Sequence, residues 1–176
     1  MNLRIYDPTI LAIDLRHRRF GYGVFEGHRL LIDWGERAYR AVGEEEATIA
    51  SRRLAALLRL FSPSVIVLKK ERWERVQGNL RLRPLAEAVA RVASEHSVPI
   101  HLVGQDDIRT TFHNLGCETR EEIAVALARI FPELVWRLPP KRRAWEAEHH
   151  RMILFDAIAL GVAYWQHPVA RPSTAD

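Results

Sequence analysis

The feature that most restricts the fold is the apolar run Ile10–Leu15, which carries a single acid, Asp14. A short apolar run of this kind is typical of a buried strand. Two further strand-like segments follow at Phe20–Phe25 and Arg29–Trp34, and only a few polar residues join each to the one before. Connections this short predict an antiparallel meander of three strands. Gly21 and Gly23 lie inside the second strand, where we expect them to allow either close approach of another backbone or a bulge.

After the meander the apolar residues recur every three or four positions, as on one face of a helix. We predict four helices and two more strands, at Glu44–Phe61, Ser64–Leu68, Arg83–His96, Ile100–Val103, Thr119–Phe131 and Ala144–Gln166. This order predicts an α/β fold, in which a mixed five-stranded sheet combines the antiparallel meander with parallel strands and is flanked by helices. The 176 residues suffice for one domain, which we expect over residues 1–166, with residues 167–176 as a flexible tail.

Composition narrows the classes of function. The chain has 26 Lys and Arg residues against 22 Asp and Glu, a net charge of +4 that mildly favours polyanionic partners such as nucleic acid. The single cysteine, Cys117, excludes an internal disulfide and a thiolate zinc site. No apolar run is long enough to cross a membrane, and residues 1–6 lack a signal-peptide pattern. We therefore expect a cytoplasmic protein without a membrane partner.

Three acids stand in places where a solvated carboxylate is unusual. Asp14 ends a buried strand, Glu71 follows the strand Ser64–Leu68, and Asp156 interrupts an apolar stretch of the last predicted helix. A lone buried carboxylate is costly, so each needs a cation or hydrogen bonds. Carboxylates that converge at a sheet edge suit divalent cations. The pattern predicts a metal site formed by Asp14, Glu71 and Asp156, although Asp14 taken alone would favour a turn cap.

The order of these motifs resembles a known family. The run Ile10–Asp14, followed after a short gap by Gly21-Tyr22-Gly23-Val24, is similar to the opening of the RuvC Holliday-junction resolvases of the RNase H-like superfamily. Pro63–Leu68 resembles the fourth strand of that family, and Asp156–Leu160 resembles its closing helix. The resemblance implies an RNase H-like fold and a structure-selective DNA endonuclease that resolves four-way junctions in recombination and repair. It also implies a homodimer, with a branch-migration helicase as a further partner.

In the mechanism that the resemblance implies, Asp14, Glu71 and Asp156 are catalytic and hold Mg²⁺, or Mn²⁺, at the scissile phosphate. Metal-bound water would attack in line, and the metal would stabilise the leaving oxygen. Arg109 and Arg120 stand where the family has two lysines, and they would neutralise phosphate charge.

Departures from the family pattern leave a second interpretation open. Lys69 stands where the family has a glutamate, Ile153 where it has an acid or histidine, and Leu15-Arg16 where it has Pro-Gly. An ammonium group at Lys69 would oppose cation binding. The chain is thus either a nuclease with a displaced ligand or a catalytically weakened protein that binds branched DNA. An actin-like phosphotransferase is a third hypothesis, against which stands the lack of a second domain and of glycine-rich phosphate loops.

Basic and aromatic residues supply candidates for DNA contacts. Trp73 follows the fourth strand, where it would either stack on an unpaired base or pack beneath its own loop. Lys141, Arg142 and Arg143 present three cations together after two prolines, as a phosphate contact or as a solvated charge run. With Lys69, Arg109 and Arg120, these residues form the predicted DNA-binding set.

Overall fold

The computed structural model describes residues 7–40, 44–140 and 149–167. Its five strands form one sheet in the order β3-β2-β1-β4-β5. The strands are β1 (Thr9–Arg16), β2 (Arg19–Glu26), β3 (Leu30–Ala38), β4 (Val65–Lys69) and β5 (Ile100–Val103). Strands β1, β2 and β3 pair antiparallel, whereas β4 lies parallel to both β1 and β5. The predicted mixed five-stranded sheet with an antiparallel meander is confirmed.

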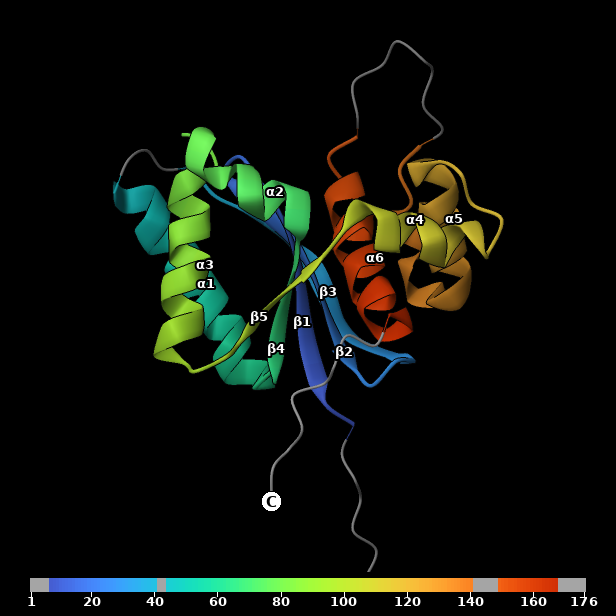
Figure 1. Ribbon diagram of the computed structural model, residues 1–176, viewed down its shortest axis with the longest axis horizontal. Helices are drawn as coiled ribbons and strands as arrows, with labels where there is room; N and C mark the ends of the chain where they lie inside the picture. Colours follow the sequence, from blue (N-terminus) through green and yellow to red (C-terminus); the bar gives the residue numbers. More distant parts are fainter. Residues whose placement is uncertain (1–6, 41–43, 141–148, 168–176) are drawn as a thin grey trace, which may run out of the picture.

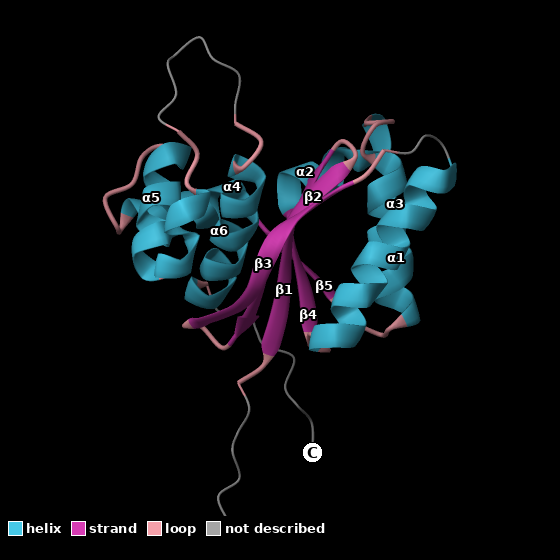
Figure 2. Cartoon of the chain, turned by 180° about the vertical axis from the view of Figure 1, so that it is seen from behind, coloured by secondary structure: helices cyan, strands magenta, loops and turns pink. Residues whose placement is uncertain are grey.

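Helices cover both faces of this sheet (Figures 1 and 2). Helices α1 (Glu44–Phe61) and α3 (Arg83–Glu95) pack together on one face. The other face carries α4 (Gln105–His113), α5 (Arg120–Ile130), the 3₁₀ helix η2 (Pro132–Arg137) and α6 (Met152–Gln166). None of the helices in the described ranges is both long and apolar enough to span a membrane.

Four short helices of the described ranges, α4 and η2 among them, were missed in the sequence. The chain enters α2 (Lys70–Glu74) directly from β4 and continues into the 3₁₀ helix η1 (Arg75–Gly78), segments too short to show a helical period. The nine-residue α4 buries only three residues, so its pattern is equally weak. The last helix begins at Met152, so the predicted start at Ala144 is wrong for residues 149–151, and residues 144–148 lie outside the described ranges. Most of the predicted tail, residues 168–176, also lies outside them.

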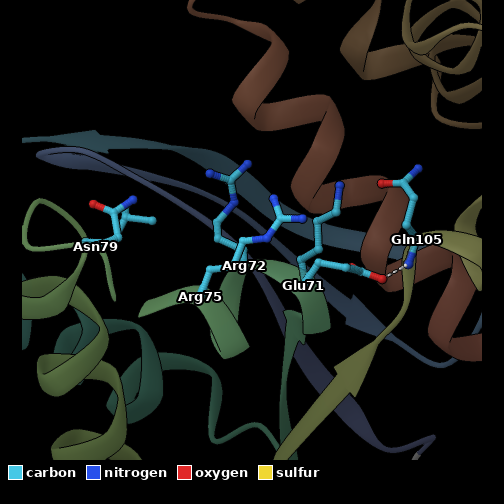
Figure 3. Close-up of a pocket in the computed structure, with 7 residues that line it drawn as sticks. Glu71, Arg72, Arg75, Asn79 and Gln105 are labelled. Carbon is cyan, nitrogen blue, oxygen red and sulfur yellow. Dashed lines mark hydrogen bonds between the residues drawn. The ribbon is translucent and has the colours of Figure 1, made fainter. Parts of the chain in front are cut away.

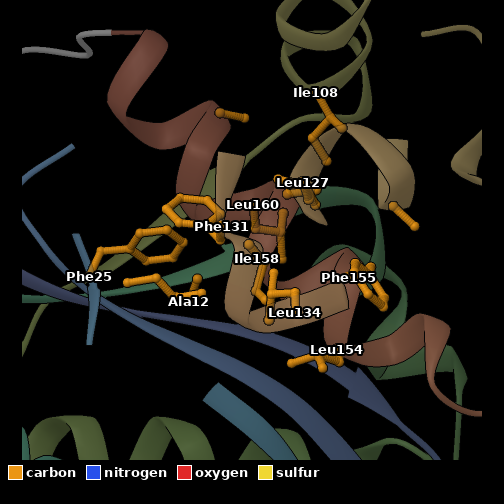
Figure 4. Close-up of a cluster of buried hydrophobic side chains, with 14 of the residues drawn as sticks. Ala12, Phe25, Ile108, Leu127, Phe131, Leu134, Leu154, Phe155, Ile158 and Leu160 are labelled. Atoms are coloured by element: carbon orange, nitrogen blue, oxygen red, sulfur yellow. The ribbon is translucent and has the colours of Figure 1, made fainter. Parts of the chain in front are cut away.

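Strand β1 is buried on both faces because helices lie on both sides of it. Ile10 and Ala12 join the apolar cluster under α6, part of which is drawn in Figure 4. Leu11, Ile13 and Leu15 join the cluster under α1 and α3. Side chains alternate between the faces of a strand, so Asp14 and Arg16 lie on the same side as Ala12, toward α6. This alternation positions the candidate site.

Candidate functional site

Asp14 and Asp156 come together because α6 lies directly against β2. The partner of Asp14 on β2 is Gly21. A Cβ atom on Gly21 would overlap the backbone carbonyl of Ile153, the second residue of α6. Asp156 follows Ile153 by three residues and therefore lies on the same side of the helix, next to the end of β1. The close backbone approach expected at Gly21 is confirmed, and it brings the two acids to one place.

The two carboxylates are bridged by an arginine. The Arg16 Nε atom donates to Asp14 Oδ2 at 2.8 Å, and its Nη2 atom donates to Asp156 Oδ2 at 2.8 Å. Arg120, the first residue of α5, also donates to both oxygens of Asp156. Arg72 of α2 forms an ion pair with Asp14, with 3.3 Å between its Nε atom and Asp14 Oδ1. Each acid is therefore held by two guanidinium groups.

Burial makes this arrangement electrostatically demanding. The Asp14 side chain is 1% exposed, and its burial, followed by the nearby Asp156 charge, raises its pKa, while Arg16 and Arg72 act in the opposite direction. Burial lowers the pKa of Arg16, but Asp14 and Asp156 outweigh this effect and raise it above the ordinary value. Arg16 therefore carries its charge at any accessible pH. The bridging group is a permanent cation.

Lys69 adds a further positive charge, and Glu71 does not reach the acids. Val65, Val67 and Lys69 alternate toward α6, so Lys69 lines the same small cavity as Asp14 and Asp156. Burial lowers the pKa of Lys69, against the opposing effect of the two acids. In a chain extended as far as Glu71, the Glu71 side chain would lie on the same face as Lys69. The chain instead becomes helical at Lys70, and this turns the Glu71 side chain away.

Glu71 stabilises the start of α4 instead. Its Oε1 atom accepts the backbone N–H of Gln105 at 2.7 Å (Figure 3). Partial burial raises the pKa of Glu71, but the Gln105 N–H and its own backbone N–H, with Lys69 and Lys70, outweigh burial and lower it. The Glu71 carboxylate is therefore ionised and engaged outside the pair Asp14–Asp156.

This centre does not fit the divalent cation that the resemblance implies. Within the described ranges, no group of three or more His, Cys, Asp or Glu side chains is placed to hold a metal ion. Three of the four carboxylate oxygens of Asp14 and Asp156 accept guanidinium hydrogen bonds, whereas the buried Asp14 Oδ1 forms only the ion pair with Arg72 and accepts no hydrogen bond among the described residues. Four cations, Arg16, Arg72, Arg120 and Lys69, face two carboxylates. We call these six residues the carboxylate centre; its excess charge is positive.

A cavity of about 330 Å³ adjoins the carboxylate centre along α2 (Figure 3). Its polar lining comes from Lys69, Glu71, Arg72, Arg75, Asn79 and Gln105. In Figure 3 the guanidinium groups of Arg72 and Arg75 extend to the same side of α2, while Glu71 bends toward Gln105. Apart from the Glu71 carboxylate, which accepts the Gln105 N–H, the polar lining of this α2 cavity consists of cations and amides, the groups that bind phosphate oxygens.

The other predicted DNA contacts are dispersed. Arg109 is 73% exposed on α4 and lies 3.8 Å from Asp106, one turn before it. Trp73 is half-buried against the apolar cluster of α1 and α3, which fits packing beneath its own segment better than stacking on a base. Lys141, Arg142 and Arg143 lie outside the described ranges. Of this set, Lys69 and Arg120 reach the carboxylate centre.

Sequence reasoning missed Arg16 and Arg72 as members of the centre. For Arg16 a signal existed, because in a strand it must lie on the same face as Asp14, two residues earlier. For Arg72 there was none, since its direction depends on the short helix α2.

The fold of this chain is similar to that of several proteins of known structure. The chain superposes on Thermus thermophilus RuvC with a TM-score of 0.65 and 19% identity, over 88% of this chain and 92% of that one. It has the fold of the RuvC-type resolvases. T. thermophilus RuvC in complex with Holliday junction substrate matches equally, with a TM-score of 0.65 and 17% identity, over 89% and 91% of the two chains.

The yeast mitochondrial Holliday junction resolvase Ydc2 also matches, with a TM-score of 0.57 and 16% identity, over 93% of this chain and 81% of that one. Neither the family models nor the curated protein sequences gave a match. The RNase H-like fold expected from the sequence is confirmed, and the similarity to junction resolvases lies in structure much more than in sequence identity.

Proposed function

We propose that this protein binds branched DNA, with four-way junctions as the preferred substrate, and leaves the DNA uncut. The observation that carries the proposal is the Arg16 guanidinium, which bridges Asp14 and Asp156 at 2.8 Å from each. A divalent cation needs these carboxylate oxygens as ligands. Here they bind a permanent cation instead.

Charge supports binding of an anion. With four cations against two carboxylates, the carboxylate centre attracts phosphate groups. The adjoining α2 cavity adds further hydrogen-bond donors for phosphate, from Arg75, Asn79 and Gln105. Guanidinium groups pair with phosphate oxygens through two parallel hydrogen bonds. The overall +4 charge acts in the same direction. The structural similarity to a RuvC determined with junction DNA supports the choice of substrate.

A nuclease is the second candidate, and one observation favours it. The fold brings Asp14 and Asp156 to one place, as two-carboxylate metal binding requires. For that function Arg16 would have to leave both acids.

The test is incubation of the protein with a synthetic four-way junction and with a linear duplex of equal length, in Mg²⁺, in Mn²⁺ and in chelator. Native gels report binding and denaturing gels report cleavage. We expect the junction to be shifted and intact under all three conditions. Arg75→Gln should weaken the shift, whereas Arg59→Gln, an exposed change on α1, should not. Paired symmetric nicks that require metal and vanish in Asp156→Asn would overturn the proposal in favour of the nuclease.

A further inference from the structure

A second basic cavity lies at the turn between β1 and β2. Its volume is about 610 Å³, and its basic residues are His17, Arg18, Arg19, Arg40 and Arg53. Among the described residues that line it there is no carboxylate. We call it the hairpin cavity. It takes no part in the carboxylate centre or in the α2 cavity, and none of the candidate residues chosen from the sequence belongs to it.

The cavity is built on a fixed frame. Arg18 occupies the left-handed region, with φ of 54°, at the tip of the hairpin, and its carbonyl accepts the Tyr39 N–H at 3.0 Å. This bond ties the tip to the end of β3. Arg53 of α1 donates from Nη1 to the Ala38 carbonyl at 2.8 Å, which places its guanidinium group at the cavity. The Arg53 guanidinium group and the Arg18 backbone are therefore held in place before any ligand arrives.

Polar groups in the cavity lack partners. Arg18 Nε and Tyr39 Oη are both buried. Among the described residues, Arg18 Nε donates no hydrogen bond, and Tyr39 Oη neither donates nor accepts one. Tyr39 is 6% exposed and lines the cavity. Burial, followed by the nearby Glu46 carboxylate, raises the pKa of Tyr39 to about 12, against Arg18 and Arg53, so its hydroxyl remains a donor. Buried donors without acceptors are costly, and an anion would satisfy them.

Repulsion between arginines that face each other across the hairpin also favours a bound anion. Arg16 and Arg19 are direct partners on β1 and β2, and like charges in that position repel. Arg16 is neutralised by Asp14 and Asp156. For the four arginines of the hairpin cavity, no ion pair with a carboxylate is found among the described residues. The buried Glu46 carboxylate lies near Tyr39, so the four arginines retain an excess of positive charge, which an anion would balance.

The hairpin cavity lies close to the carboxylate centre. Arg19 lines both the hairpin cavity and a smaller cavity that contains Arg16 and His149. His17 Nδ1 lies 3.3 Å from the carbonyl of Arg81, in the loop between η1 and α3, beside the α2 cavity. The basic residues His17 and Arg81 therefore lie between the α2 cavity and the hairpin cavity.

We propose that the hairpin cavity binds a phosphate group of the nucleic-acid backbone, as a second anchor for the DNA that the carboxylate centre contacts. The phosphate oxygens accept hydrogen bonds from Arg18, Arg19 and Arg40, and the Tyr39 hydroxyl completes the set. This inference rests on the proposed function, since it assumes that DNA is the ligand. A free phosphate ion has the same chemistry, so the experiment has to separate the two sources.

The first arm measures junction affinity by fluorescence anisotropy over a series of salt concentrations. The double variant Arg19→Gln/Arg40→Gln should lower the slope of log K against log salt by about 1 to 2 and weaken binding roughly tenfold at low salt. Arg52→Gln is the matched control, since Arg52 is exposed on α1 next to Arg53 but does not line the cavity. Arg40→Gln alone, at an exposed position, covers the case in which the double variant fails to fold.

The second arm titrates inorganic phosphate and follows thermal unfolding. A rise in Tm that is lost in the double variant, together with unchanged DNA binding, would assign the cavity to a free anion and overturn the proposal. DNA binding equal to that of the wild type in the variants, without a phosphate effect, would also overturn it. The proposed function fails differently, by metal-dependent cleavage in the wild-type protein, and in that case the salt slopes of the variants still decide whether the cavity binds DNA.

Discussion

Two groups of arginines lie on either side of the end of the β1–β2 hairpin, and they differ in what they face. Arg16, Arg72 and Arg120 bind carboxylates at Asp14 and Asp156. Arg19 and Arg40, in the hairpin cavity, face other cations. The same side chain thus stabilises the fold in one place and is left available for a ligand in the other. Removal of an arginine should therefore have opposite consequences in the two regions.

The largest effect is expected for Arg16→Gln. Without the bridge, Asp14 and Asp156 face each other with less compensation, and unfolding should require about 3 kcal/mol less at neutral pH. Burial and Asp156 raise the pKa of Asp14, and loss of Arg16 raises it further. A raised native pKa lowers stability as the pH rises through that pKa, so the loss should be greater at pH 8 than at pH 5. Urea unfolding at both values measures this.

The same variant tests the metal interpretation. Millimolar Mn²⁺ should raise the Tm of Arg16→Gln, whose carboxylates are exposed to a cation, and leave the wild-type Tm unchanged. Arg59→Gln serves as the control for general charge effects. An equal Mn²⁺-dependent rise in the wild-type protein would mean that the bridge yields to metal, and the two arginine groups would then differ less than we infer.

Gly21→Ala should reduce stability by about 2 kcal/mol, because the new methyl group overlaps the Ile153 carbonyl and must push α6 outward. Gly78→Ala is the matched control, since a Cβ atom there meets no neighbour within 4 Å. In the Gly21→Ala background the cost of Arg16→Gln should shrink, because Asp156 no longer lies within reach of the bridge. Fully additive losses would contradict this account of the centre.

Glu71→Gln should cost about 1 kcal/mol, since it weakens the charged acceptor at the start of α4. The pKa of Glu71 is lowered in the folded protein from an ordinary value of 4.5. Its contribution is therefore present above pH 4.5 and is lost as the pH falls through the lower native pKa. Unfolding curves from pH 7 to pH 3 should converge for variant and wild type. Glu74→Gln, at an exposed position of α2, is the matched control for removal of one negative charge from this helix.

The smallest effect is expected for Arg19→Gln in the absence of DNA. Removal of one of two facing cations should change the free energy of unfolding by less than about 0.5 kcal/mol, as a gain that disappears at high salt. A loss above about 1 kcal/mol would show that Arg19 stabilises the fold, as Arg16 does, and would remove the contrast between the two regions.

The fold was predictable because its signals are local. The short turns of the meander and the helical period of α1 and α3 were visible in the sequence, and Asp14 and Asp156 could be chosen because each interrupts an apolar stretch. The placement of Glu71 was not predictable, because five residues of helix after β4 rotate it out of the strand's alternation. The role of Arg16 depends on a partner 140 residues away, which spacing along the chain does not reveal.

Gly21 affects the interaction energies between the charged side chains around it. In the interior the interaction between two charges falls in inverse proportion to their separation. A side chain at this position would move α6 by roughly the thickness of a methyl group, and widening an ion pair from about 3 Å to about 5 Å reduces its Coulomb energy by about 40%. The electrostatic balance of the carboxylate centre is thus governed by a residue that carries neither a charge nor a side chain.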